Sequence, residues 1–64
     1  MKYTYMDFLT RKKRYTRGQF VRWERGGVLN AYGAIFKTRM TIIFVPYYLL
    51  TSETIAKLPP VPIE

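Results

Sequence analysis

The apolar residues in the first part of the chain recur at spacings that favour short helices. Thr4 and Asp7 stand three residues apart, as in a helix capping box, and Thr16 and Gln19 form a second, stricter box. Apolar residues follow each pair near helical spacing: Tyr5, Phe8 and Leu9 after the first, and Phe20, Val21 and Trp23 after the second. This pattern predicts two short amphipathic helices within residues 1–27.

A long apolar stretch follows, and from residue 40 to residue 52 the chain carries no charge. As a helix this run would be roughly 20 Å long, short of the ~30 Å hydrocarbon core of a membrane. A window of residues 36–55 closes the gap and leaves Lys37 and Arg39 near one end, where their side chains reach the headgroups. The pattern predicts a helical segment over residues 28–56 whose residues 36–55 span a membrane, kinked by a central proline.

The same run also fits a buried β-strand. Residues 41–45 are rich in β-branched and aromatic side chains, and Pro46 would end a strand there. A short strand in a small soluble α+β module is therefore the alternative. Because the apolar sequence continues past the proline, we favour the spanning helix.

The end of the chain holds three of the four prolines, so residues 57–64 are predicted to form an extended, polyproline-II-like tail. The elements together predict an all-α fold. It would be a small single-pass membrane protein with a basic amphipathic arm, one kinked transmembrane helix and a proline-rich tail. It would not be an independent globular domain.

Composition narrows the function further. The chain has 64 residues, no Cys and no His, so a disulfide framework, a thiolate zinc site and the commonest general base are excluded. Its four carboxylates are Asp7, Glu24, Glu53 and Glu64, and no two of them share a helical i,i+3 or i,i+4 spacing. We therefore expect no enzyme activity, no cofactor and no metal site.

The net charge of +7 is unevenly distributed. Residues 1–39 hold ten basic residues against two acidic ones, a net charge of +8, whereas residues 40–64 hold one against two, a net charge of −1. Such a charge asymmetry indicates which kind of partner the chain binds rather than which fold it adopts. It favours an anionic surface near the first half of the chain: a lipid leaflet, RNA or an acidic protein patch.

Basic and aromatic residues alternate between residues 11 and 25, and this run has two interpretations. As a membrane flank, it predicts headgroup contacts, with cardiolipin as one candidate lipid, from Arg22, Trp23, Arg25, Lys37 and Arg39. As an RNA-binding run, it predicts phosphate contacts from the cations and base stacking by Tyr15, Phe20 and Trp23. Residues predicted to pack against neighbouring helices are Gly27, Ala31, Gly33, Pro46, Tyr47 and Tyr48.

The overall plan is similar to that of the small single-pass accessory subunits of respiratory-chain complexes and ATP synthase. It predicts a non-catalytic accessory subunit held among larger subunits of a mitochondrial inner-membrane complex, and not a free monomer. The positive-inside rule places the N-terminus in the matrix and the C-terminus in the intermembrane space. The alternative is a small basic supernumerary protein of an organellar ribosome that binds rRNA.

Overall fold

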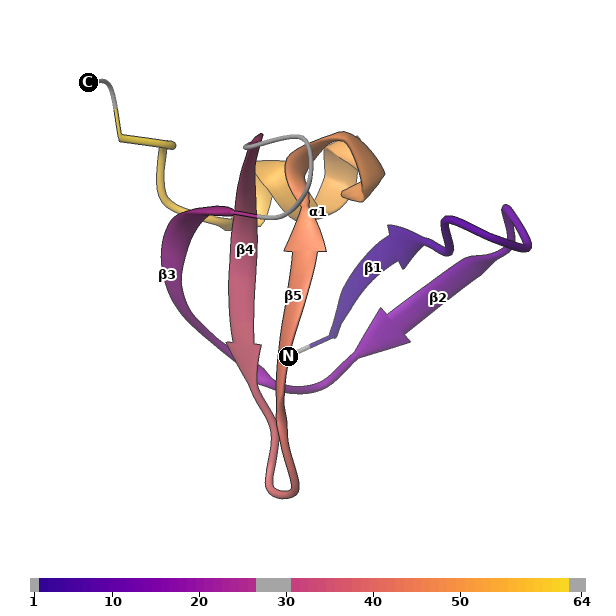
Figure 1. The fold of residues 1–64 in the computed structure, drawn as a ribbon, viewed down its shortest axis with the longest axis horizontal. Helices are drawn as coiled ribbons and strands as arrows, with labels where there is room; N and C mark the ends of the chain where they lie inside the picture. Colours follow the sequence, from indigo (N-terminus) through magenta and orange to yellow (C-terminus); the bar gives the residue numbers. More distant parts are fainter. Residues whose placement is uncertain (1, 27–30, 63–64) are drawn as a thin grey trace.

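Two small antiparallel β-sheets and one short helix make up the fold. The computed structural model describes residues 2–26 and 31–62. The first sheet pairs β1 (Tyr3–Met6) with β2 (Lys13–Thr16), and the second is a meander of β3 (Gln19–Gly26), β4 (Ala31–Lys37) and β5 (Ile42–Pro46). A 3-10 turn, η1 (Tyr47–Leu49), and a helix, α1 (Ser52–Lys57), follow. Figure 1 shows α1 behind the meander and the β1–β2 hairpin beside it.

The expectation of an all-α membrane protein is wrong. Strands replace the two helices predicted within residues 1–27, and β4, β5 and η1 lie where the helix over residues 28–56 was predicted, with α-helix only from Ser52. Among the described residues, no helix has the length and apolarity needed to cross a membrane. The physical reason is the two-residue alternation of β5, in which Ile43 and Val45 face the core while Ile42 and Phe44 are exposed. The strand alternative was therefore right for this run.

Cross-strand pairing aligns the apolar side chains on the inner face of the meander. Phe36 on β4 pairs with Phe20 on β3 and with Ile43 on β5. Its ring is fully buried, with its centroid 5.1 Å from that of Tyr3 on β1 and 6.0 Å from that of Phe20. Further buried members of this core are Ala34, Val45, Leu50 and Leu58. The chain therefore has a hydrophobic core of its own, contrary to the expectation that it would not form a globular domain.

On the outer face of the meander an aromatic ring packs directly on a glycine of the neighbouring strand. The ring of Phe44 lies over Gly33, and a Cβ added at Gly33 would come within 2.4 Å of it. A larger residue at position 33 would displace the ring. Gly33, which was predicted to allow close packing of helices, therefore allows close packing within a sheet.

Helix α1 is attached to β1 by a cluster of threonine hydroxyls. Thr51 caps the helix by accepting from the backbone N–H of Thr54. Thr54, which is 1% exposed, accepts from the backbone N–H of Thr4 and donates to its carbonyl, both at 2.8 Å. The two ends of the chain are therefore joined at the side of the core.

The β1–β2 connection explains why the first capping box did not start a helix. Asp7 accepts from the backbone N–H groups of Leu9 and Thr10 at 2.9 and 3.0 Å, as a helix cap would. Arg11 then takes a φ of 60°, in the left-handed region, and its N–H bonds to the carbonyl of Asp7. The aspartate therefore caps a turn that returns the chain as β2.

Candidate functional site

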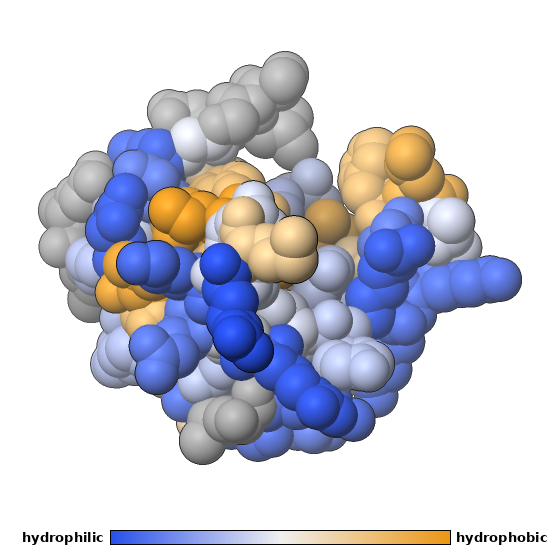
Figure 2. Space-filling view, turned by 90° about the horizontal axis from the view of Figure 1, so that it is seen from below, coloured by the Kyte–Doolittle hydropathy of each residue, from blue (hydrophilic) through white to orange (hydrophobic). Residues whose placement is uncertain are grey.

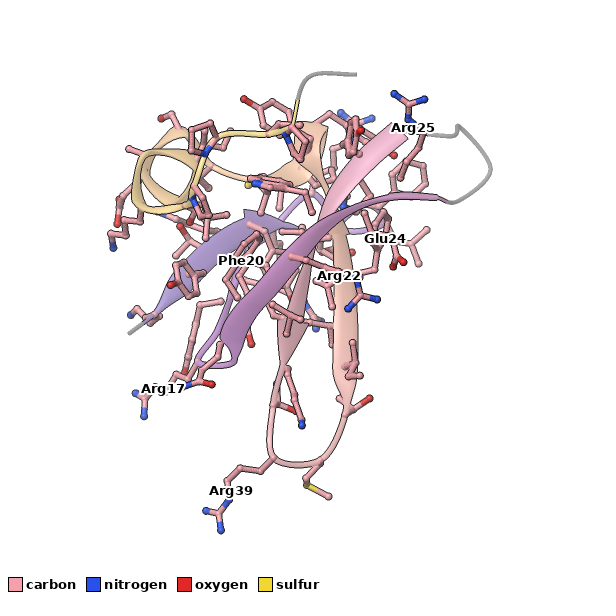
Figure 3. All side chains as sticks on the ribbon, turned by 90° about the vertical axis from the view of Figure 1, so that its left-hand side faces the viewer. Arg17, Phe20, Arg22, Glu24, Arg25 and Arg39 are labelled. Atoms are coloured by element: carbon pink, nitrogen blue, oxygen red, sulfur yellow. The ribbon has the colours of Figure 1, made fainter. Side chains whose placement is uncertain are left out.

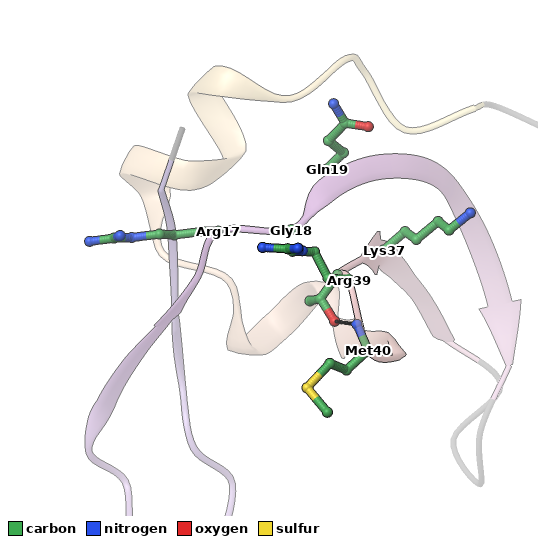
Figure 4. Close-up of a pocket in the computed structure, with 7 residues that line it drawn as sticks. Arg17, Gly18, Gln19, Lys37, Arg39 and Met40 are labelled. Atoms are coloured by element: carbon green, nitrogen blue, oxygen red, sulfur yellow. Dashed lines mark hydrogen bonds between the residues drawn. The ribbon is translucent and has the colours of Figure 1, made fainter.

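An open depression lies where the β2–β3 connection meets the β4–β5 turn. It has a volume of about 680 Å³. Seven residues line it, and we call them the basic depression: Arg17, Gly18, Gln19, Lys37, Thr38, Arg39 and Met40. Figure 4 shows these side chains contributed by the two segments.

Gly18 makes this arrangement possible. A Cβ added at Gly18 would lie 2.9 Å from the carbonyl oxygen of Lys37 and 3.0 Å from Cγ2 of Thr38. Only a residue without a side chain lets the two backbones approach this closely. The contact brings Arg17 to the same depression as Lys37 and Arg39, although about twenty residues separate them in the sequence.

Hydrogen bonds hold both segments in place. The hydroxyl of Thr16 accepts from the N–H of Gly18 at 3.1 Å. At the β4–β5 turn the hydroxyl of Thr38 accepts from the N–H groups of Met40 and Thr41 at 3.3 and 3.0 Å, and it donates to the carbonyl of Thr41 at 2.9 Å. The cations therefore stand on an ordered backbone.

The charge of the depression is not compensated locally. No lining residue is acidic, and Arg17, Lys37 and Arg39 are all exposed. The three carboxylates in the described part of the chain pair elsewhere: Asp7 with Arg14 at 3.1 Å, Glu24 with Arg22 at 3.3 Å and Glu53 with Lys57 at 3.7 Å. Figure 2 looks at the end of the molecule that carries the β4–β5 turn, and it shows hydrophilic side chains over much of this face.

An exposed aromatic ring extends the basic surface beyond the depression. Tyr15 on β2 is 55% exposed. The ammonium of Lys2 lies 4.8 Å from the centre of its ring, and the guanidinium of Arg17 lies 5.9 Å from it. Arg17 therefore connects Tyr15 with the depression, and together they offer phosphate contacts beside a stacking surface.

Two of the five predicted headgroup residues, Lys37 and Arg39, line the depression. The other three lie on β3. Arg22 pairs with Glu24 on the outer face, Arg25 stacks on Tyr32 at 4.8 Å, and Trp23 is half-buried against the core. In Figure 3, Arg17 and Arg39 lie toward one end of the molecule and Arg25 lies at the other. The structure therefore divides the predicted set between two regions.

The predicted helix-packing positions occupy other elements, because the helix itself is absent. Ala31 and Gly33 belong to β4 and Pro46 ends β5. Tyr47 and Tyr48 form the exposed part of η1. Gly27 lies outside the described residues. The transmembrane helix on which these positions were expected to pack is absent from the described residues.

Of the aromatic residues predicted to stack on bases, only Tyr15 is exposed. Phe20 packs against Phe36, and Trp23 lies 5.4 Å from Phe20, ring centre to ring centre. The sequence argument missed Arg17 and Gly18 as site residues. Their signal is an arginine followed by a glycine between two strands, and it could be interpreted only once the strands were known.

The lining of the depression carries three cations, Arg17, Lys37 and Arg39, and no acidic side chain. Within residues 2–26 and 31–62, no three acidic side chains come together in a way that could hold a metal ion. Away from the depression, hydrogen bonds from the backbone of Thr10 and Leu9, and secondarily the charge of Arg14, lower the pKa of the Asp7 carboxyl below 3.8.

Comparison of the chain with protein-family models, curated proteins and solved structures finds no significant match. Function must therefore be argued from the chemistry of the surface itself.

Proposed function

We propose that the chain binds single-stranded nucleic acid through the phosphates, with Arg17, Lys37 and Arg39 as the principal contacts and Tyr15 as a stacking surface. The observation that carries the proposal is the meeting of three exposed cations in one depression without a carboxylate. Cations on an ordered backbone favour a linear polyanion, whose condensed counterions are released on binding. Tyr15 favours an unpaired base over a duplex.

This proposal develops the ribosomal alternative but commits to no particle or compartment. The prediction of an accessory subunit in a mitochondrial inner-membrane complex stays a prediction, as do the lipid contacts and the location. Its structural basis, the spanning helix, is absent from the described residues.

The test replaces Arg17, Lys37 and Arg39 by alanine in one variant. We expect affinity for a labelled single-stranded RNA of about 20 nucleotides to fall at least about tenfold near 50 mM salt, measured by fluorescence anisotropy. The slope of log K against log salt should become shallower by about 2, because each lost phosphate contact on a single strand removes about 0.7.

The chain offers a matched control. Arg14, Arg22 and Lys57 are the cations already paired with carboxylates, and replacing all three by alanine lowers the net charge from +7 to +4, as the test variant does. The control should retain most of the affinity. Equal losses in the two variants would indicate non-specific charge attraction and overturn the proposal, as would tighter binding to a duplex or to anionic vesicles than to the single strand.

A further inference from the structure

The proline-rich end of the chain lies against aromatic side chains at a different place from the basic depression. Residues 59–62 form no helix or strand, and they follow Leu58, which is buried in the core. The indole N–H of Trp23 donates to the carbonyl of Pro59 at 2.9 Å. Figure 1 shows this segment leaving α1 and passing the end of β3.

The surface beneath the tail is built from three elements. An open depression of about 420 Å³ lies there, lined by Ala31 and Tyr32 on β4 and by Tyr47 and Tyr48 on η1. Val61 of the tail completes the lining. The ring of Tyr47 lies 5.8 Å from that of Trp23, so the four aromatic side chains are continuous. We call Trp23, Tyr32, Tyr47 and Tyr48 the aromatic groove.

The chemistry of this groove fits an extended proline-rich chain. A polyproline-II segment has no internal hydrogen bonds, so its carbonyls remain free to accept from a donor such as an indole N–H. Its proline rings pack on flat aromatic faces, and its stiffness lowers the entropic cost of binding. The tail accepts such a bond at the carbonyl of Pro59, and it places the apolar side chain of Val61 among the tyrosines.

The tail covers this surface only loosely. Pro59, Pro60 and Pro62 are exposed, and Val61 is half-buried. Tyr47 and Tyr48 also remain exposed, at 41% and 54%. A ligand attached to its own site acts at an effective concentration of the order of millimolar, so weak contacts are enough to keep it there.

We propose that the aromatic groove is a docking site for a proline-rich segment of another protein in the polyproline-II conformation, and that residues 59–62 occupy it in cis until such a segment displaces them. This proposal is independent of nucleic-acid binding, because it uses none of the residues of the basic depression. Leu58 stays in the core during the exchange, and only the residues after it leave the surface.

The test weakens the tail in the full chain. Pro60→Gly, Val61→Ser and Pro62→Gly, combined in one variant, remove the stiffness and the apolar contact while leaving Leu58 and Pro59 in place. The probe is a fluorescein-labelled peptide of sequence KLPPVP, which repeats residues 57–62. We expect the tail variant to bind it at least about tenfold more tightly than the native chain, measured by anisotropy.

A second substitution in the tail variant tests whether the indole N–H of Trp23 donates to the peptide. Trp23→Phe keeps an aromatic ring but removes the N–H, and it should weaken peptide binding about threefold to tenfold. Leu9→Ala, which removes an exposed apolar side chain outside both the groove and the basic depression, is the control and should leave binding unchanged. A peptide with its prolines replaced by alanine should not bind.

The results that overturn the proposal are equally definite. Binding that is no tighter in a folded tail variant, or that is insensitive to Trp23→Phe, would show that the tail only covers the core. If the tail variant fails to fold, millimolar peptide added to the native chain should still shift the emission of Trp23, the single tryptophan. Absence of that shift would overturn the proposal.

A native chain that dimerises through its tail, detected by light scattering and lost in the tail variant, would identify a second copy as the occupant instead.

Discussion

At the residue scale, the hydroxyl of Thr54 joins the two ends of the chain. Besides its two bonds to the backbone of Thr4, it lies 3.1 Å from the hydroxyl of Thr51. We expect Thr54→Val to lower the free energy of unfolding by about 1–3 kcal/mol, because the shape is kept but the buried N–H of Thr4 loses its acceptor. Urea denaturation measures this loss. Thr54→Ser keeps the hydroxyl and should retain most of the stability, and a loss from Thr54→Val no larger than that from Thr54→Ser would contradict the role of the hydroxyl.

Asp7 predicts a dependence of stability on acid. Its folded pKa lies below the ordinary 3.8 because the ionised carboxylate accepts from the backbone of Thr10 and Leu9, with a further contribution from Arg14. The ionised form therefore stabilises the fold at pH values above the unfolded pKa, and this contribution disappears as the pH falls through the folded pKa. We expect the difference in Tm between the native chain and Asp7→Asn to narrow steadily as the pH falls below 3.8. A difference that stays constant down to pH ~2 would contradict this origin.

At the scale of elements, Gly18 couples the β2–β3 connection to the β4–β5 turn. We expect Gly18→Ala to destabilise the fold by about 1–3 kcal/mol, because the new methyl group would meet the backbone carbonyl of Lys37 rather than a side chain that could move. The same shift should weaken RNA binding by moving Arg17 away from Arg39. Thermal unfolding and anisotropy measure the two effects.

Gly26 provides the control for that substitution. It lies at the end of β3, and a Cβ added there would have no atom within 4 Å. Gly26→Ala should leave stability within about 0.5 kcal/mol of the native value and RNA binding unchanged. If both substitutions acted alike, the close approach at Gly18 would not be the cause.

The same elements show what the sequence could predict. The β-branched and aromatic residues at positions 41–45 were sufficient to predict a strand, but the apolar residues that continue past Pro46 outweighed them. In the fold that apolarity is used by η1, whose Tyr47 packs on Trp23. The capping boxes were misleading for a physical reason. The hydroxyl of Thr4, the expected N-cap, bonds Thr51 and Thr54 across the fold. The hydroxyl of Thr16 accepts a backbone N–H in a turn as it would at the start of a helix.

At the scale of the whole molecule, the charge asymmetry was visible in the sequence and the site was not. The basic depression depends on Arg17 lining the same hollow as Lys37 and Arg39, and this arrangement requires a sheet register and a glycine that no local pattern reveals. Lys37 and Arg39 could be singled out because they interrupt an apolar stretch. Of the aromatic groove, Trp23, Tyr47 and Tyr48 were singled out from the sequence for other roles, and Tyr32 was not. The pairing of β3 with β4 and the turn after β5 bring the four together.

The threonine cluster also sets an order of events during synthesis. The β1–β2 hairpin is complete once residue 16 has been made, but its bonds to α1 join residues 47 to 50 positions apart. In the meander, by contrast, each strand pairs only with a strand that is next to it in the sequence. Strand β1 must therefore wait for α1, and the β1–β2 hairpin remains without this partner until the residues of α1 have been synthesised.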